Sequence, residues 1–200
     1  MRARPDSLTR VIAAMTRGHG PSSDFDLNPG LAPRDGPVLR PAGVLVAVCD
    51  RQDGPHVLLT KRASGLKHHP GQIAFPGGKV DAGDADAVAA ALREAQEEAG
   101  LDPALAEVLG TLPHHETVTG FDVTPVLAWV PSAFSTRCEP GEVDEAFFVP
   151  LGFLLDPSNY RIERRMWRGQ ERAYFTVPFG PYYIWGATAR ILRVMADLAA

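Results

Sequence analysis

The sequence is poor in cysteine, in excess positive charge and in long apolar runs. Its two cysteines, Cys49 and Cys138, are too few and too far apart for a disulfide framework or a zinc site. The formal net charge of −4 argues against general nucleic-acid binding, which requires a basic surface. No segment approaches the roughly 20 apolar residues of a membrane span, and no signal-peptide stretch opens the chain. We therefore expect a cytoplasmic protein without a membrane or nucleic-acid partner.

Length and composition predict one domain preceded by a short N-terminal segment. Two hundred residues with 45% hydrophobic content can bury a core, and no internal repeat divides the chain. Apolar residues at helical spacing predict a helix over residues 5–17, and the Pro-, Gly- and Asp-rich stretch 19–41 predicts an irregular tether. We assign residues 1–41 to this helix and tether, and residues 42–200 to the domain.

Alternating and apolar segments predict the sheet and helices of that domain. The expected strands are 43–49, 56–62, 107–112, 122–130, 145–149, 161–168 and 172–177. The expected helices are 86–99, ending at Gly100, and 184–199, whose apolar face consists of Ala187, Ile191, Val194 and Leu198. Helices at two points among the strands predict a sheet covered on both faces. Cys49 lies in an apolar strand pattern and is expected in the core.

Three glutamates crowd one side of the helix predicted at 86–99. At 100° per residue, Glu94, Glu97 and Glu98 fall within an arc of about 100°. The opposing apolar stripe consists of Val88, Leu92, Ala95 and Ala99. Like charges at i,i+4 destabilise a helix by about 0.2–0.5 kcal/mol per pair, so a bound cation would stabilise the cluster. Taken alone, an acidic helix face is more often solvated surface, and the residues around it decide between the two interpretations. Carboxylate oxygens suit Mg²⁺ or Mn²⁺.

The surroundings of the glutamates carry a family resemblance. Phe75-Pro76-Gly77-Gly78 lies upstream, where glycine permits close backbone approach to a ligand, and Arg93 stands four residues before Glu97. The run resembles the Nudix box, G-x5-E-x7-R-E-U-x-E-E-x-G-U, in which U is aliphatic. Gly78 matches the first glycine, and residues 93–101 supply every fixed residue of the second half.

One position of the box departs from the pattern. Asp84 stands where the box has its first glutamate, and eight residues instead of seven separate it from Arg93. Asp84 either does the structural work of that glutamate, or Asp84 or Asp86 caps the helix. We favour the capping role, because aspartate is a strong N-cap residue.

A second motif points to one branch of the family. Residues 58–78, LLTKRASGLKHHPGQIAFPGG, resemble the pattern LLTxR(S/A)xxLRxHxGQxxFPGG of the coenzyme A pyrophosphatase branch, with Lys67 where that branch usually has arginine. The similarity continues in residues 117–126 and from Glu142-Val143 to Pro150-Leu151, and it covers roughly residues 38–198.

The resemblance implies an α/β/α sandwich with a mixed sheet and a metal-dependent diphosphate hydrolase. Its expected substrate is coenzyme A or a derivative, cleaved to 4′-phosphopantetheine and adenosine 3′,5′-bisphosphate. Glu94 and Glu98 would hold Mg²⁺ or Mn²⁺. Glu97 would be a third ligand or orient Arg93, and the carbonyl of Gly77 or Gly78 would add another. The catalytic base is open among Glu94, Glu97 and Glu142.

A basic stretch beside the acidic helix fits a polyphosphate substrate. It gathers Lys61, Arg62, Lys67, His68 and His69 within nine residues. Cations next to a metal site can bind the phosphate groups that the metal does not hold, such as the ribose 3′-phosphate of coenzyme A. We leave His68 unassigned, since adjacent histidines point in different directions. The full set of expected substrate-binding residues is Lys61, Arg62, Lys67, His69, Gln72, Gly77 and Gly78.

Other interpretations remain open. The box alone also fits a Nudix hydrolase for ADP-ribose, dinucleotides or nucleoside triphosphates. A non-catalytic nucleotide-binding module is a further alternative, although such modules typically lose box glutamates, which this chain retains. A homodimer is left open. Five arginines near the expected C-terminal hairpin could bind an anionic partner or form plain surface: Arg161, Arg164, Arg165, Arg168 and Arg172.

Overall fold

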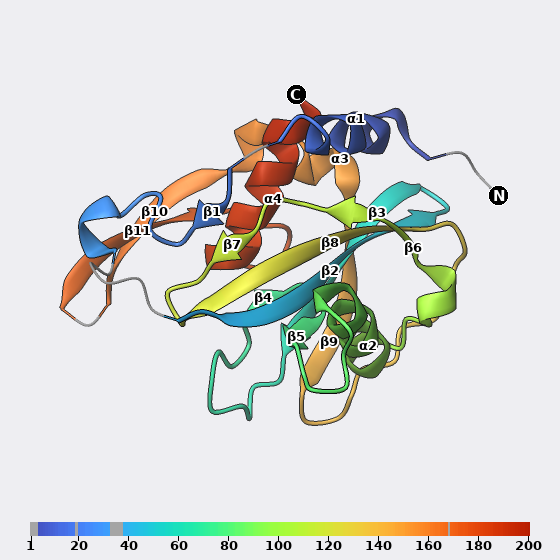
Figure 1. Ribbon diagram of the computed structural model, residues 1–200, viewed down its shortest axis with the longest axis horizontal. Helices are drawn as coiled ribbons and strands as arrows, with labels where there is room; N and C mark the ends of the chain where they lie inside the picture. Colours follow the sequence, from blue (N-terminus) through green and yellow to red (C-terminus); the bar gives the residue numbers. More distant parts are fainter. Residues whose placement is uncertain (1–3, 19, 33–37, 168) are drawn as a thin grey trace.

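A mixed β-sheet runs through the centre of the molecule (Figure 1). The computed structural model describes residues 4–18, 20–32, 38–167 and 169–200. Nine strands of this described part form the sheet: β1 (Ser22–Ser23), β2 (Arg40–Arg51), β3 (Gly54–Arg62), β4 (Ile73–Ala74), β5 (Gly77–Lys79), β6 (Glu107–Thr111), β7 (His115–Glu116), β8 (Phe121–Val130) and β9 (Val143–Pro150). A separate hairpin consists of β10 (Arg161–Trp167) and β11 (Gln170–Thr176). The α-helices are α1 (Asp6–Met15), α2 (Ala87–Ala99), α3 (Leu151–Leu154) and α4 (Gly186–Ala199).

The two longest sheet strands, β2 and β8, set the register of the sheet. They run parallel from the pair Arg40 and Phe121 to the pair Cys49 and Val130. Strand β3 pairs antiparallel with both β2 and β9, and β6 and β7 pair antiparallel with β8. The sheet is therefore mixed, as predicted.

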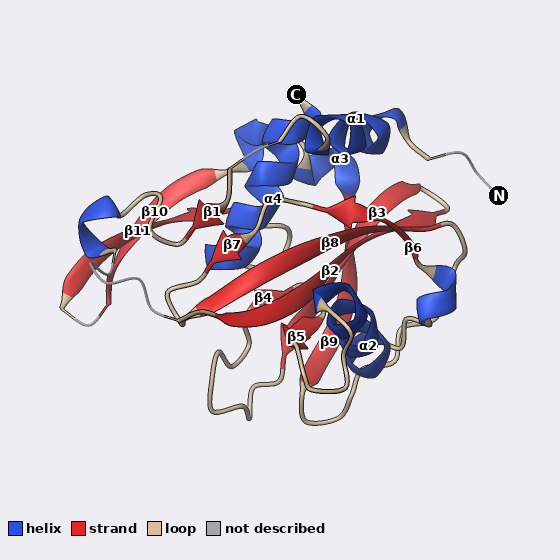
Figure 2. Ribbon diagram, viewed as in Figure 1, coloured by secondary structure: helices blue, strands red, loops and turns tan. Residues whose placement is uncertain are grey.

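Helices cover both faces of this sheet (Figure 2). Along β2, Leu45, Ala47 and Cys49 pack on the α2 side, whereas Val46 and Val48 join the core shared with α1, α3 and α4. Side chains that alternate in direction along a strand are all buried when both faces are covered. The α/β/α sandwich is thus confirmed, and Cys49 is a core residue.

Helix α2 packs closely against β2, and the face of α2 that is buried differs from the predicted one. A Cβ on Gly43 would lie 2.0 Å from the carbonyl oxygen of Ala87, so only small side chains fit between helix and sheet. The buried residues of α2 are Ala90, Ala91, Ala95, Glu98 and Ala99. The predicted apolar stripe is therefore right for Ala95 and Ala99, whereas Val88 and Leu92 are only half-buried.

The N-terminal segment is less irregular than expected. Helix α1 buries Leu8 and Val11 in the core that α4 shares. Within the predicted tether, β1 pairs parallel with β7, and residues Pro29–Leu31 form a 3-10 helix. Positions 19 and 33–37 of the tether lie outside the described residues, so the boundary at 41 stays a prediction.

The predicted C-terminal hairpin and helix are both present, but their end residues and the buried face of the helix differ from the prediction. The strands expected at 161–168 and 172–177 pair as β10 and β11, with residue 168 outside the described part. Helix α4 buries Ile191 and Leu198 as predicted, while Ala187 and Val194 are half-buried. None of the described helices combines the length and the apolar character needed to cross a membrane.

Candidate active site

The three glutamates of α2 occupy different environments. Glu98 is 4% exposed, and its Oε2 accepts a hydrogen bond of 3.2 Å from the backbone N–H of Gly77. The Glu94 side chain is 18% exposed, whereas that of Glu97 is 55% exposed. Strand β5 comes so close to the helix that a Cβ on Gly78 would lie 2.4 Å from Oε1 of Glu94. The glycine pair therefore allows two carboxylates to approach the β5 backbone.

Arg93 connects these carboxylates to the preceding loop. Its Nε and Nη2 each donate a hydrogen bond of 2.9 Å to the carboxylate of Asp84. Its Nη1 donates at 2.9 Å to Glu94 and at 2.9 Å to Glu97. One planar guanidinium thus fixes three acidic side chains, which a lysine could not do with comparable geometry.

The structure separates the two aspartates that sequence could not distinguish. Asp86 is the N-cap of α2, and its Oδ1 accepts the N–H of Ala89 at 2.8 Å. Asp84 does not cap the helix. Its side chain is 6% exposed, and the hydrogen bonds from Arg93 lower the pKa of its carboxyl group. The capping interpretation is therefore right for Asp86 and wrong for Asp84, which binds the box arginine across the one-residue longer spacer.

Burial and mutual repulsion make the carboxylates reluctant to ionise. Burial, with the charges of Glu94 and Glu142 adding to it, raises the pKa of Glu98 to about 7, against opposing effects of the Gly77 hydrogen bond and Arg62. Burial also raises the pKa of Glu94, although Arg93 opposes this shift. Glu142, which precedes β9, is exposed yet close enough to act on both. Full ionisation of these carboxylates would therefore concentrate negative charge at this point of the fold.

The donor set fits a hard divalent cation. A metal ion would offset the repulsion between Glu94 and Glu98 and favour their ionised forms. In the described part of the chain, no three acidic, histidine or cysteine side chains already form a complete metal cluster. Glu98 and Glu94 lie against Gly77 and Gly78 of β5, whereas Glu97 is more than half exposed. Glu94 and Glu98 are therefore the pair best placed as ligands, with backbone, water or substrate oxygens completing the shell.

Strand β3 divides the basic stretch between two places. Lys61 lines a large cavity, whereas Arg62 lies near enough to Glu98 for its charge to lower the pKa of that carboxyl group. A register shift between β3 and β9 falls between Lys61 and Arg62. The Nε of Arg62 is buried and has no hydrogen-bond partner among the described residues. Lys67 and His68 are exposed and do not line the cavity.

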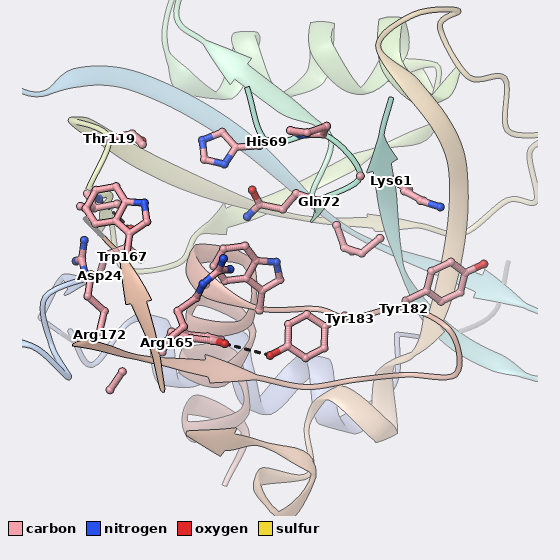
Figure 3. A pocket seen from close by; sticks show the side chains of 18 of the residues that line it. Asp24, Lys61, His69, Gln72, Thr119, Arg165, Trp167, Arg172, Tyr182 and Tyr183 are labelled. Carbon is pink, nitrogen blue, oxygen red and sulfur yellow. Dashed lines mark hydrogen bonds between the residues drawn. The ribbon is translucent and has the colours of Figure 1, made fainter. Parts of the chain in front are cut away.

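The cavity has a volume of about 770 Å³ and lies between the loop at 69–73, the β10–β11 hairpin and the segment 181–186 (Figure 3). His69 and Gln72 line it, and His69 has a φ of 54°, in the left-handed region that few non-glycine residues occupy. Basic and aromatic side chains form much of the remaining lining. These residues are Arg165, Trp167, Arg172, Tyr174, Tyr182, Tyr183 and Trp185. Of these, only Arg165 and Arg172 had been singled out, as members of an arginine cluster.

A signal for the missed residues exists in the strand pattern. Every second residue of β10 faces the cavity side of the hairpin together with its cross-strand partner on β11. The pairs are Glu163 with Tyr174, Arg165 with Arg172, and Trp167 with Gln170. A polar and aromatic face on a two-stranded ribbon indicates a lined surface. The segments on the other side of the cavity, 69–73 and 181–186, could not be predicted from the sequence.

The comparison with protein families decides the classification. The model of the NUDIX domain matches residues 39–167. The chain belongs to the Nudix family. It is a Nudix hydrolase, whose general activity is pyrophosphohydrolysis. The family generally uses divalent metal ions, and the domain implies a small nucleotide-type substrate.

Two curated relatives agree with this membership. The Uncharacterized Nudix hydrolase NudL of Enterobacter sp. (strain 638) is 43% identical over 157 residues, which cover 78% of this chain and 81% of the relative. NudL of Salmonella paratyphi B is 44% identical over the same shares. The Nudix hydrolase RenU of M. smegmatis is 26% identical with a TM-score of 0.49, over 59% of this chain and 81% of RenU. An Ap4A hydrolase of C. elegans is 23% identical with a TM-score of 0.46, over 56% of this chain and 80% of that chain.

Proposed function

We propose that this Nudix hydrolase cleaves the diphosphate of coenzyme A or its derivatives to 4′-phosphopantetheine and adenosine 3′,5′-bisphosphate. The observation that carries the proposal is where the fold places residues 58–78, which resemble the coenzyme A branch motif. Its His69 and Gln72 line the cavity, and its last residues, Gly77 and Gly78, lie against Glu98 and Glu94. One continuous motif thus joins a nucleotide-sized cavity to the acidic centre.

The carboxylates would position the reacting diphosphate. When bound by Glu94 and Glu98, a divalent cation supplies charge stabilisation for the phosphoryl oxygens and lowers the pKa of water. Arg93 donates hydrogen bonds to both Glu94 and Glu97. We assign Glu97 the role of orienting Arg93, which in turn positions Glu94. The buried, unpartnered Nε of Arg62 is available to donate to a phosphate oxygen beside this centre.

Of the three candidate bases, Glu142 has the best position. Glu94 and Glu97 both accept hydrogen bonds from Arg93, so one oxygen of each carboxylate is already occupied. Glu142 is exposed, and its charge acts on both Glu94 and Glu98. We assign it the removal of a proton from the attacking water. The water oxygen then bonds to one phosphorus, and the bond from that phosphorus to the bridging oxygen breaks.

A substrate panel tests the proposal. Coenzyme A, ADP-ribose, NADH and a nucleoside triphosphate would be incubated with Mg²⁺ and with Mn²⁺, and the products separated by mass. We expect 4′-phosphopantetheine and adenosine 3′,5′-bisphosphate from coenzyme A, and loss of both in Glu142→Gln at unchanged melting temperature. Preferential cleavage of ADP-ribose or a dinucleotide would instead support the alternative nucleotide pyrophosphatase. Activity on none of them would favour a binding module.

A further inference from the structure

We infer that the cavity between the 69–73 loop and the β10–β11 hairpin binds the phosphorylated nucleoside half of the substrate, and that the pantetheine half lies outside it. The identity of that half, adenosine 3′-phosphate, rests on the proposed function. The inference itself rests on the rings and charges that line the cavity, shown in Figure 3.

The aromatic side chains of the cavity are fixed against one another. Tyr174 and Trp185 meet edge to face, with ring centroids 5.4 Å apart. The hydroxyl of Tyr183 donates to Glu163 at 2.6 Å and lies 3.3 Å from the hydroxyl of Tyr174. Rings held in this way lose little conformational freedom when a planar ligand stacks on them, and aromatic side chains are the usual stacking partners of nucleic-acid bases. A purine is such a ligand, whereas pantetheine has no ring.

The charges of the cavity favour an anion. The guanidinium of Arg165 lies 5.3 Å from the ring centroid of Trp185, and that of Arg172 lies 5.0 Å from the centroid of Trp167. Arg172 stands close enough to Asp24 for the two charges to interact, whereas no such carboxylate neighbour is seen for Arg165 among the described residues. Lys61 adds a third cation. These groups suit a phosphate monoester and would be left without a partner by the uncharged amides of pantetheine.

The acidic residues at the cavity are already engaged. Asp24 forms a hydrogen bond of 3.2 Å with Nε2 of buried His115 and accepts the N–H of Val118 at 2.9 Å. Glu145 accepts a hydrogen bond of 2.5 Å from the hydroxyl of Tyr182. Because neighbours already donate to these carboxylates, Arg165 and Lys61 stay available to an anionic ligand in the cavity.

The cavity also connects to the acidic centre through backbone. Gly71 donates to the carbonyl oxygen of Arg62 at 3.0 Å, and the N–H of Arg62 donates to the carbonyl oxygen of Gln72 at 3.0 Å. The wall that carries His69 and Gln72 is thereby joined to the strand that places Arg62 beside Glu98. A nucleoside in the cavity would direct its 5′-diphosphate along this strand.

The test measures binding without turnover. Calorimetric titration of the full chain, in the presence of a metal chelator, would compare adenosine 3′,5′-bisphosphate, adenosine 5′-monophosphate and 4′-phosphopantetheine. The variant is Arg165→Ala. The matched control is Arg164→Ala, the next residue of β10, which is directed to the opposite face of the hairpin and pairs with Glu171. Trp185→Leu removes a ring without changing charge.

We expect adenosine 3′,5′-bisphosphate to bind more tightly than 4′-phosphopantetheine. Arg165→Ala should weaken the bisphosphate roughly ten-fold or more and the monophosphate less, because a charge-assisted contact is lost. Trp185→Leu should weaken both nucleotides, and Arg164→Ala should change neither. Equal effects of Arg165→Ala and Arg164→Ala, or an Arg165-dependent affinity for 4′-phosphopantetheine, would overturn the inference.

The experiments distinguish an error in the proposed substrate from an error in the cavity assignment. If wild type leaves coenzyme A uncleaved while its bisphosphate affinity depends on Arg165, the assignment of coenzyme A as substrate fails and the nucleotide cavity stands. If wild type cleaves coenzyme A while Arg165→Ala retains the wild-type ratio of kcat/KM between coenzyme A and 3′-dephospho-coenzyme A, the function stands and the cavity assignment is wrong.

Discussion

The guanidinium of Arg93 and the carboxylate of Asp84 form a two-point contact, with both hydrogen bonds at 2.9 Å. Asp84 reaches the arginine although aspartate is shorter than glutamate and the spacer is one residue longer than in the box. The same arginine holds Glu94 and Glu97 through Nη1. The position of two carboxylates of the candidate site therefore depends on an aspartate in the loop between β5 and α2.

This relationship predicts different effects for two nearby aspartates. Asp84→Asn keeps the shape of the side chain but weakens a charge-assisted contact worth about 1.5–3 kcal/mol. We expect kcat/KM to fall about ten-fold or more. Asp86→Ala removes only the helix cap, so it should cost about 1 kcal/mol of stability with little loss of activity. Steady-state kinetics and thermal melts would measure both. Equal loss of activity in the two variants would contradict separate roles.

The glycines of β5 supply a second matched pair. In Gly78→Ala, the new Cβ would meet the Glu94 carboxylate at 2.4 Å, and this flexible group can move aside. In Gly77→Ala, the Cβ would meet the backbone oxygen of Gly43 at 2.5 Å, which the sheet fixes in place. We expect Gly78→Ala to lose activity with a small change in melting temperature. Gly77→Ala should be strongly destabilised. A stable, fully active Gly78→Ala would show that Glu94 does not need its present position.

Metal binding should depend most on Glu98. Removing one anionic ligand by Glu98→Gln should lower turnover by roughly two orders of magnitude, since metal-assisted charge stabilisation contributes several kcal/mol. Glu97→Gln should have a smaller effect, because Glu97 contacts Arg93 and is more than half exposed. Mg²⁺ or Mn²⁺ should raise the melting temperature of wild type and not that of Glu98→Gln. Near-native turnover of Glu98→Gln at saturating Mg²⁺ would refute the proposed site.

The raised pKa of Glu98, about 7, predicts a pH-dependent stability of the metal-free protein. The folded state keeps the proton of Glu98 at pH values where the unfolded carboxyl group has lost it. Stability should therefore fall as pH rises from the unfolded pKa of about 4.5 to about 7, and the loss should persist above that pH. Its upper limit is roughly 3 kcal/mol. In a chelator, Glu98→Gln should melt at a higher temperature than wild type at pH 8 and at a similar temperature at pH 4. A constant difference across this range would contradict the prediction.

Periodicity predicted the long elements because their patterns extend over many residues. Strands β2, β3 and β8 and helices α2 and α4 all lie close to their expected ranges. The short strands β1, β4, β5 and β7 escaped, since two or three residues cannot display an alternation. They form where neighbouring strands offer free hydrogen-bonding groups.

The site was predictable where chemistry is local in sequence. The contact between Arg93 and Glu97 follows from i,i+4 spacing and is confirmed. The burial of Glu98 is a tertiary effect that arises because α2 lies against β5 and β2. The cavity combines His69, Arg165 and Trp185 from three distant segments, so no local pattern could assemble it.

The central claim, that the Nudix centre of this chain acts on coenzyme A, is tested most directly by kcat/KM. The measurement compares coenzyme A with ADP-ribose at equal concentrations of Mg²⁺, with Glu98→Gln as the inactive control. Our account predicts a higher kcat/KM for coenzyme A, and release of 4′-phosphopantetheine and adenosine 3′,5′-bisphosphate that Glu98→Gln abolishes. An equal or higher kcat/KM for ADP-ribose would contradict it.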